Sequence, residues 1–380
     1  MYRRLIRLVV LCVVAVFLSA AWLHVHSLSV CASDGLEGLH DAAAEVVLPE
    51  GAESAFSDIG ISAEDPTAVL ELSPSEWIGM LWDTAKREIT APIALLSALL
   101  TLILLSSTLA GMQDTVASGE MRKLLDMLCV LVCVGASAEP FCTCLRRTAD
   151  ALTEGSVFMG SFVPVFGGFL AAGGAVASGT SYQMLVLFLT QAMQQLTRHL
   201  LFPLLECAAA LGIADAVNPS LRLNGMVGGL RKAVTWILGF LMTAFASLLS
   251  IRSFVADAAD GLAVKTVRLM TSSLIPVVGG AVSEAYGSVQ GSIRLMQSGT
   301  GVIGILGIVW LTVPPLISAV CYRAVFSLAG IAAELTGTDA VRGLCRDIEG
   351  VLGAAFAMLV TYAVMLIFST AIMLMLVGNE

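Results

Sequence analysis

One pattern, Ser-x-x-Pro-Val-x-Gly-Gly, occurs twice in this chain, at 161–168 and again 112 residues later at 273–280. Each copy lies inside an apolar run that is too long for a soluble loop. Proline removes a backbone donor and glycine lowers helix propensity, so both runs are predicted to be helices that break or kink at corresponding places. The predicted breaks are Pro164, Gly167, Gly168, Pro276, Gly279 and Gly280.

Such breaks are tolerated in a membrane only where protein or water satisfies the freed backbone groups. A broken helix that recurs in two halves of a membrane protein indicates a shared packing centre or a pathway. The pattern by itself does not establish transport.

The composition places the chain in a membrane. Apolar residues make up 57% of it and charged residues 13%, against roughly 25% charged in an average soluble domain. We therefore predict an all-α polytopic membrane protein in contact with lipid. Its 20 Lys and Arg are outnumbered by 29 Asp and Glu and form no long basic run, so no nucleic-acid partner is expected.

The N-terminus has the features of a signal peptide over residues 1–32. Arg3, Arg4 and Arg7 precede an apolar stretch, and Val30 and Ala32 fit the positions before a signal peptidase cleavage site. The alternative is an uncleaved first transmembrane helix, because the apolar stretch is slightly long for a signal peptide. Both alternatives export the segment that follows.

Residues 33–76 are predicted to form an acidic extracytoplasmic arm or linker. From Ser33 to Asp83 there are twelve acidic residues and no Lys or Arg, a composition that translocates easily and has too little apolar area to form a core.

Residues 77–380 are predicted to form the helical membrane domain, with six to eight membrane segments. The predicted apolar segments are Ala91–Met112, Leu124–Leu145, the first motif run to Ser178, Tyr182–Ile213 with a kink at Pro203, Ala233–Ile251, Leu274–Val289, Gly299–Cys321 broken at Pro314 and Pro315, and Val351–Val377. Three amphipathic segments are predicted at Cys144–Met159, Arg252–Ser272 and Ser327–Gly350, the first of them as an interfacial helix.

The order of these segments indicates an internal duplication. An amphipathic helix, a motif run, a long span with internal proline and a small-residue segment follow one another in residues 144–215 and again in residues 252–335. Coincidence is the alternative, because Gly and Pro are frequent in transmembrane helices.

No motif for catalysis is present. The sequence lacks a phosphate-binding G-x-x-x-x-G-K-[ST], a G-x-S-x-G and an H-E-x-x-H, so we predict no enzyme, no catalytic residue and no cofactor. Cys129 and Cys133 share one helix face, and Cys142 and Cys144 follow. We favour packing over metal ligation for these cysteines, because no histidine accompanies them, and predict no metal site.

The candidate intramembrane polar residues are Arg198, His199 and Glu206, with Glu139 and Glu284 as further carboxylates. Buried carboxylates could relay protons or line an aqueous path. The alternative, which we favour, is that Arg198 or His199 pairs with a neighbouring carboxylate while the other carboxylates reach an interface.

At several of these residues the chain resembles the stage III sporulation protein AE family. The resemblance rests on Gly160-Ser-Phe-Val-Pro-Val, on Leu230-Arg-Lys-Ala-Val-Thr-Trp-Ile-Leu-Gly with Thr243-Ala-Phe, and on Asp260-Gly followed by Leu274-Ile-Pro-Val-Val-Gly-Gly-Ala-Val-Ser-Glu-Ala. It covers roughly residues 77 to 380, and the family also starts with a signal sequence.

The resemblance implies a non-enzymatic component of a sporulation-specific channel or secretion-like complex. Its expected partners are the other stage III sporulation A proteins, which include a secretion-type ATPase and ring-forming members, and through the complex forespore protein Q. That complex would join mother cell and forespore and support late forespore gene expression. A homo-oligomer is possible, and the alternative function is a secondary transporter or permease built on the duplication.

Overall fold

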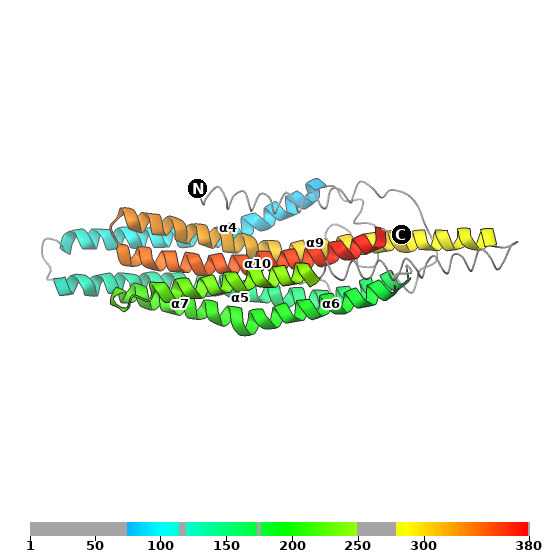
Figure 1. Cartoon of the computed structure of the whole chain (residues 1–380). Helices are drawn as coiled ribbons and strands as arrows, with labels where there is room; N and C mark the ends of the chain where they lie inside the picture. Colours follow the sequence, from blue (N-terminus) through cyan, green and yellow to red (C-terminus); the bar gives the residue numbers. More distant parts are fainter. Residues whose placement is uncertain (1–73, 114–118, 173–175, 249–278, 379–380) are drawn as a thin grey trace.

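The structure is a computed structural model that describes residues 74–113, 119–172, 176–248 and 279–378. These residues form long helices that run along one axis, and no strand occurs among them (Figure 1). The predicted signal peptide and the acidic arm up to residue 73 lie outside the described residues, and so does the amphipathic segment Arg252–Ser272. The prediction of an all-α membrane protein is confirmed.

The first two described helices form a hairpin at one end of the bundle. Helix α4 spans Pro74–Gln113 and α5 spans Gly119–Ala172. Arg147 of α5 forms an ion pair with Glu88 of α4, with Nη1 and Oε2 2.5 Å apart. Nearer the tip, the Ser107 hydroxyl reaches the carbonyl of Thr336, so the hairpin also packs beside the turn between the last two helices.

The next helical segments form one bent rod. Helix α6 (Val176–Leu196) continues through a π-helical turn, η2 (Thr197–Leu201), into α7 (Phe202–Val217). Pro203 has no N–H to donate to the preceding turn, and wider i→i+5 turns accommodate such a disruption without ending the helix. The rod bends at this point (Figure 1). The kink predicted at Pro203 is therefore located at a π-helical turn.

A tight connection leads from α7 into the helix over residues 224–248. It contains the short 3-10 helix η3 (Pro219–Leu221) and Arg222, whose φ is 50°. The buried Asp215 carboxylate accepts a hydrogen bond from the Leu223 N–H at 2.6 Å, which fixes the chain where it reverses. The predicted span Ala233–Ile251 begins in helix 224–248 and extends past the described residues.

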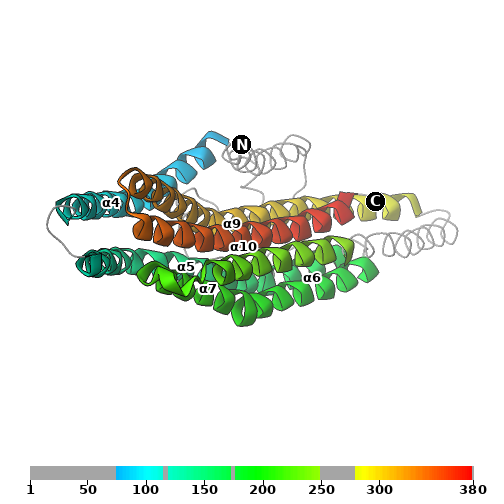
Figure 2. The ribbon, with the colours of Figure 1, turned by 60° about the vertical axis from the view of Figure 1, so that its left-hand side comes forward.

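The last two helices pair along most of their length. Helix α9 spans Gly279–Leu335 and α10 spans Asp339–Gly378; they run side by side in Figures 1 and 2. They are joined at Gly337, whose φ of 73° lies in the left-handed region that glycine adopts without strain. The predicted amphipathic segment Ser327–Gly350 therefore comprises the end of α9, the turn at Gly337 and the start of α10.

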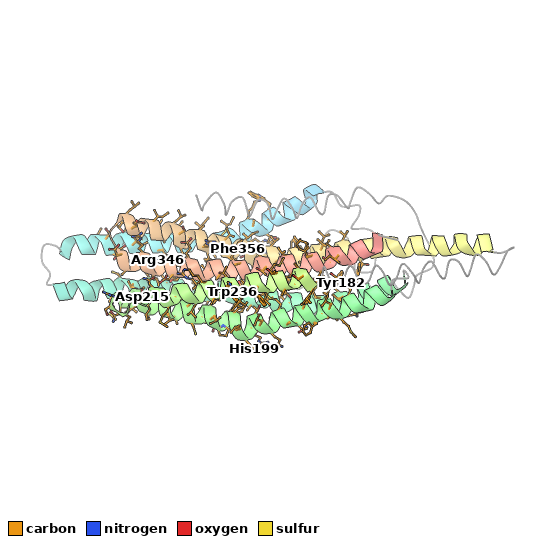
Figure 3. All side chains as sticks on the ribbon, viewed as in Figure 1. Tyr182, His199, Asp215, Trp236, Arg346 and Phe356 are labelled. Atoms are coloured by element: carbon orange, nitrogen blue, oxygen red, sulfur yellow. The ribbon has the colours of Figure 1, made fainter. Side chains whose placement is uncertain are left out.

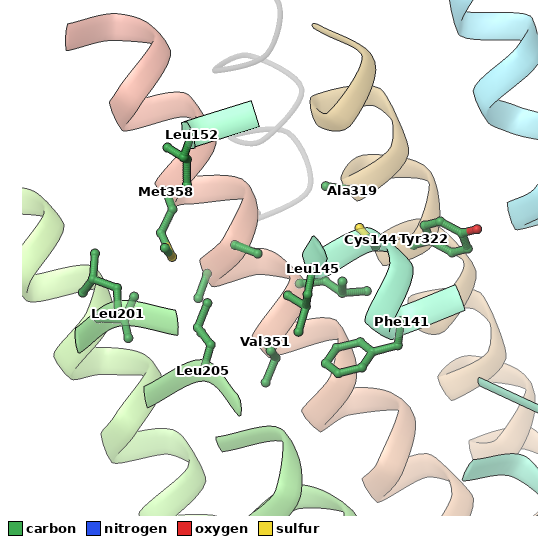
Figure 4. Packing of buried hydrophobic residues seen from close by; sticks show 14 of the residues in the cluster. Phe141, Cys144, Leu145, Leu152, Leu201, Leu205, Ala319, Tyr322, Val351 and Met358 are labelled. Carbon is green, nitrogen blue, oxygen red and sulfur yellow. The ribbon is translucent and has the colours of Figure 1, made fainter. Parts of the chain in front are cut away.

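A continuous apolar core joins these helices. Leu145 and Leu152 of α5 lie among Val351 and Met358 of α10, with Leu201 and Leu205 of the bent rod on the other side (Figure 4). Cys133, Cys144 and Cys345 are buried within this core and behave as small apolar residues. All cysteines in the described part of the chain are free.

Five helical stretches are long and apolar enough to cross a membrane. They are Trp82–Thr108, Met127–Gly168, Tyr182–Val217, Gly299–Leu335 and Asp339–Ile372. The predicted six to eight segments also include Ala233–Ile251 and Leu274–Val289, which extend outside the described residues. Side chains on the outer faces are largely apolar, as a lipid environment requires.

Two predicted helix interruptions, in the first motif run and at Pro314 and Pro315, are continuous helix in the structure. Helix α5 passes through Pro164, Gly167 and Gly168 and ends at Ala172. Helix α9 passes through Pro314 and Pro315, so the predicted break of that span is wrong. A membrane helix tolerates an internal proline when neighbouring helices hold it in place, and α9 packs on α4 and α10.

The first amphipathic segment is also part of α5. Cys144–Met159 buries Leu145, Leu152 and Met159 and exposes Arg146 and Asp150, so its amphipathic character is confirmed. It is collinear with the rest of α5 and does not form a separate helix.

The two predicted repeat halves differ in local structure. In the first half, α5 ends at Ala172 and α6 begins at Val176. The residues 112 positions after Ala172 and Val176 are Glu284 and Ser288, and both lie within α9. The duplication therefore stays a prediction, and any structural correspondence does not include the end of the helix after the first motif.

Candidate functional site

The first motif run contributes to a closely packed interface between α5 and α9. Phe158, Phe162 and Phe166 are four residues apart on α5, and successive rings stack with centroids 5.4 and 5.7 Å apart. All three side chains are buried. Four-residue spacing places them on one face of the helix, where they form a ridge of aromatic rings.

This ridge packs against glycines of α9. The Phe162 ring occupies the space that a Cβ at Gly304 would need, and a Cβ at Gly307 would lie 3.1 Å from the Phe158 ring. Small residues let membrane helices approach closely and gain van der Waals contact. Aromatic residues of α5 and glycines outside the motif therefore build this contact between α5 and α9.

Two tyrosines, one on α10 and one on α6, join α10 to its neighbours. The Tyr362 ring lies over Gly155 of α5, where an added Cβ would be 2.7 Å from the ring. The Tyr182 hydroxyl donates a hydrogen bond to the Ser369 carbonyl at 3.1 Å, which joins α6 to α10. At three places along these helices, a glycine on one helix thus faces an aromatic ring of its neighbour.

The motif glycines themselves have different surroundings. A Cβ at Gly167 would lie 2.6 Å from the Gln183 side chain of α6, whereas one at Gly168 would meet nothing within 4 Å. Pro276 lies outside the described residues, and for Gly279 and Gly280 the structure describes only the helical backbone. The proposed meeting of the two motif runs therefore stays a prediction.

Part of the polar set in α6 points into the protein. The Ser156 hydroxyl of α5 donates to Gln194 Oε1 at 2.7 Å and accepts from Gln191 Nε2 at 3.3 Å. This network satisfies side chains that would be costly against lipid. It also joins α6 to α5 next to Phe158, where the aromatic ridge begins.

The predicted intramembrane residues Arg198, His199 and Glu206 face outward. Arg198 and His199 are on the π-helical turn, and His199 is seen on the outer side of the bend in Figure 3. Within the part of the chain that the structure describes, none of the three forms an ion pair. The structure does not bring them together as a buried site.

A layer of ion pairs crosses the bundle on the other side of this core. Arg231 of helix 224–248 pairs with Asp347 of α10 at 3.5 Å, and Arg323 of α9 pairs with Glu349 of α10 at 3.6 Å. Arg147, which pairs with Glu88, follows Leu145 by two residues on α5. The Leu145 side chain lies near Val351 of α10 in Figure 4. These pairs therefore lie at one level of the bundle.

Asp347 is the centre of this layer. Its carboxylate is 3% exposed and lies 3.5 Å from Arg231 Nη2 and 4.0 Å from Arg346 Nε. Arg346 also donates to Asn224 Oδ1 at 2.7 Å, and Arg231 donates to the Arg346 carbonyl at 3.4 Å. Figure 3 labels Arg346 and Asp215 at this end of the bundle.

Two glycines make room for the cluster. A Cβ at Gly350 would overlap the Arg231 guanidinium, and a Cβ at Gly212 would lie 2.9 Å from Asp347 Cβ. Sequence reasoning missed this cluster, because its partners are more than a hundred positions apart. The local sequence offers a weak signal, a glycine close to an acidic residue, as at Gly350 after Glu349 and at Gly212 before Asp215.

The ion-pair layer separates stretches of different character. On the side of the aromatic ridge, α10 continues from Val351 to Gly378 without a charged residue, a length of about 40 Å. Helix α9 is likewise free of charge from Gly299 to Tyr322, over about 35 Å. Both lengths suffice for the ~30 Å hydrocarbon core of a bilayer. Helix α5, about 80 Å long, extends well past this layer.

The fold and this interface define a polytopic membrane protein whose helices are joined by aromatic residues, glycines and buried ion pairs. Among the described residues, no group of three or more His, Cys, Asp or Glu could hold a metal ion. The sequence model of the stage III sporulation protein AE family matches residues 66–377, and the chain belongs to that family.

A curated relative supports this assignment. The chain is 22% identical over 276 residues to the stage III sporulation protein AE of Bacillus subtilis (strain 168), which covers 73% of this chain and 69% of the relative. No solved structure matches the chain. The family resemblance predicted from the motifs is thus confirmed, and the protein is a sporulation protein.

Proposed function

We propose that this chain is a non-enzymatic membrane subunit of a sporulation-specific channel or secretion-like complex that links mother cell and forespore. Its partners would be other stage III sporulation A proteins and, through the complex, forespore protein Q. The complex would be needed for late forespore gene expression. Membership of the family supports the sporulation role.

One observation favours a structural subunit over a self-sufficient permease. The space between α5, α9 and α10 is filled by Phe158, Phe162, Phe166 and Tyr362, each at most 1% exposed. A secondary transporter holds its substrate with polar groups near the midplane of the membrane. Here the corresponding space is occupied by rings, so transport would need a path formed with other subunits.

The chain would lie in the mother-cell membrane around the forespore, with its acidic arm outside the cytoplasm. A reporter enzyme that is active only after export, fused near Pro66, should be active in this arrangement. An inactive reporter would contradict the proposed orientation of the arm.

Cross-linking and co-purification from sporulating cells test the proposed partnership. We expect the tagged chain to be recovered with other stage III sporulation A proteins. Recovery as a lone oligomer would instead support the permease, and it would also show whether copies of this chain associate with one another.

A further inference from the structure

The outer face of helix 224–248 carries a basic group followed by an aromatic pair. Lys232, Trp236 and Phe240 are four residues apart, so they form one stripe along the helix. Trp236 is 73% exposed and Phe240 62% exposed. Their rings stack on each other, with centroids 6.1 Å apart and an angle of 12° between the planes.

Cations gather where this stripe meets α10. The Arg231 and Arg346 guanidinium groups converge on the single carboxylate of Asp347. Asp347 is buried, whereas the Arg346 side chain is 59% exposed. Lys232 is exposed next to them and has no ion pair within the described part of the chain. Two arginines therefore share one carboxylate, and Lys232 adds a third positive charge beside Arg231 in the sequence.

The other carboxylates near this point are already engaged. Asp215 is buried and accepts the Leu223 N–H, and Glu349 pairs with Arg323. The accessible charge between helix 224–248 and α10 is therefore positive. Arg231 is held over the Gly350 backbone, so its guanidinium is preorganised.

The cations lie where an apolar stretch begins on both helices. Helix 224–248 has no charged residue after Lys232, and α10 has none after Glu349. Beside the aromatic pair, Gly239 faces open space, and the Thr243 hydroxyl is satisfied by the Gly239 carbonyl at 2.9 Å. This surface presents exposed aromatic rings next to a positive charge.

We propose that this surface binds one anionic phospholipid. Lys232, Arg231 and Arg346 hold the phosphate, and an acyl chain lies along Trp236 and Phe240. Basic pockets between transmembrane helices at the cytoplasmic side are suited to anionic headgroups, and an exposed aromatic ring is stable beside an acyl chain. A bound phosphate would balance the positive charge that Asp347 alone does not neutralise.

Quenching of Trp236 fluorescence tests the proposal. The full-length chain, with Trp22, Trp77, Trp82 and Trp310 replaced by Phe, is placed in phosphatidylcholine nanodiscs that contain brominated phosphatidylglycerol or brominated phosphatidylcholine. We expect phosphatidylglycerol to quench at a lower mole fraction. Equal quenching by the two lipids would overturn the proposal.

Charge variants connect the preference to these residues. Lys232→Gln and Arg346→Gln should each lower the preference for phosphatidylglycerol about fivefold, which corresponds to about 1 kcal/mol per cation. Arg342→Gln is the matched control, because it removes the same charge one turn earlier on α10, where Arg342 pairs with Glu334. Since Lys232 is exposed and unpaired, its variant should fold normally, and an unchanged preference there would exclude the site.

Inorganic phosphate separates a lipid site from a general phosphate site. At matched ionic strength, replacing chloride by phosphate should leave the quenching by brominated phosphatidylglycerol unchanged, because the acyl chain contributes to binding. Loss of the preference in phosphate would show that the surface takes the free ion, and the lipid site would then be wrong.

Discussion

The Phe162 ring of α5 lies directly over Gly304 of α9, in the space that any side chain at position 304 would need. Phe162 is itself stacked between Phe158 and Phe166, so it has little freedom to move aside. The closest approach of α5 and α9 thus depends on the absence of a single methyl group.

Gly304→Ala should therefore destabilise the protein. Overpacking a core costs about 1–3 kcal/mol, whereas Gly→Ala at an unconstrained helix position is favourable by about 1 kcal/mol. Gly160→Ala on α5 is the matched control, because a Cβ there meets nothing within 4 Å. Thermal unfolding in detergent should show a lower midpoint for the first variant and an unchanged or higher one for the second. Equal midpoints would mean that the ring can shift at no cost.

Breaking the pair between Arg231 and Asp347 should also lower stability. Removal of one partner of a fully buried pair costs roughly 3–5 kcal/mol; because Arg231 is 23% exposed, we expect about 2 kcal/mol for Asp347→Leu. The double variant Arg231→Leu/Asp347→Leu should recover part of this loss, because it removes the partly buried Arg231 charge together with its partner and leaves only Arg346, which is 59% exposed, without the carboxylate.

Thermal unfolding of both single variants and the double variant measures the coupling. Asp83→Asn is the control, because the pair between Asp83 and Lys86 is exposed and contributes little. Strictly additive effects of the two leucine substitutions would show that the Arg231–Asp347 contact does not contribute to folding.

Hydropathy and amphipathic periodicity sufficed to predict the helices and the membrane segments, because transfer into lipid is decided locally along the chain. They did not predict that α5 continues through Arg146 and Asp150, since a helix remains continuous when its charged face reaches solvent or an interface. Helix propensity alone also predicted a break at Pro314 and Pro315, where the helix is continuous. The packing of α9 against its neighbours holds that helix together.

The site was only partly predictable. The motif lies in the stretch of α5 that packs on α9, but the contacts with Gly304 and Gly307 and the pairing of Arg231 with Asp347 depend on which helices become neighbours. Arg198 and His199 were singled out as polar residues in an apolar run. Both lie exposed on the π-helical turn, whose position residue types alone do not specify.

The two glycines of the first motif should respond differently to substitution. Gly167→Leu should disrupt packing of α5 on α6, because the Gln183 side chain already occupies the space over Gly167. Gly168→Leu should be tolerated within the described structure, because nothing lies within 4 Å of a Cβ there. Yield of folded protein after size-exclusion chromatography and sporulation efficiency report the difference. Equal disruption by both variants would indicate that Gly168 packs against a partner or another part of the chain.

The two ends of α10 should be accessible from opposite sides of the membrane. The segment from Val351 to Gly378 is apolar and long enough to cross once, whereas Arg342 and Arg346 lie near its start. Since Lys and Arg are enriched in cytoplasmic loops, we expect the turn at Gly337 to be cytoplasmic and Gly378 to lie on the other side.

Cysteine labelling measures this directly. Asp339→Cys and Gly378→Cys are introduced separately into a chain whose native cysteines are replaced by alanine or serine. A membrane-impermeant maleimide added to intact cells should label only Gly378→Cys, and Asp339→Cys should react only after the membrane is opened. Labelling of both positions in intact cells would show that α10 does not cross, and the reverse pattern would show that the basic residues near the Gly337 turn do not determine its orientation.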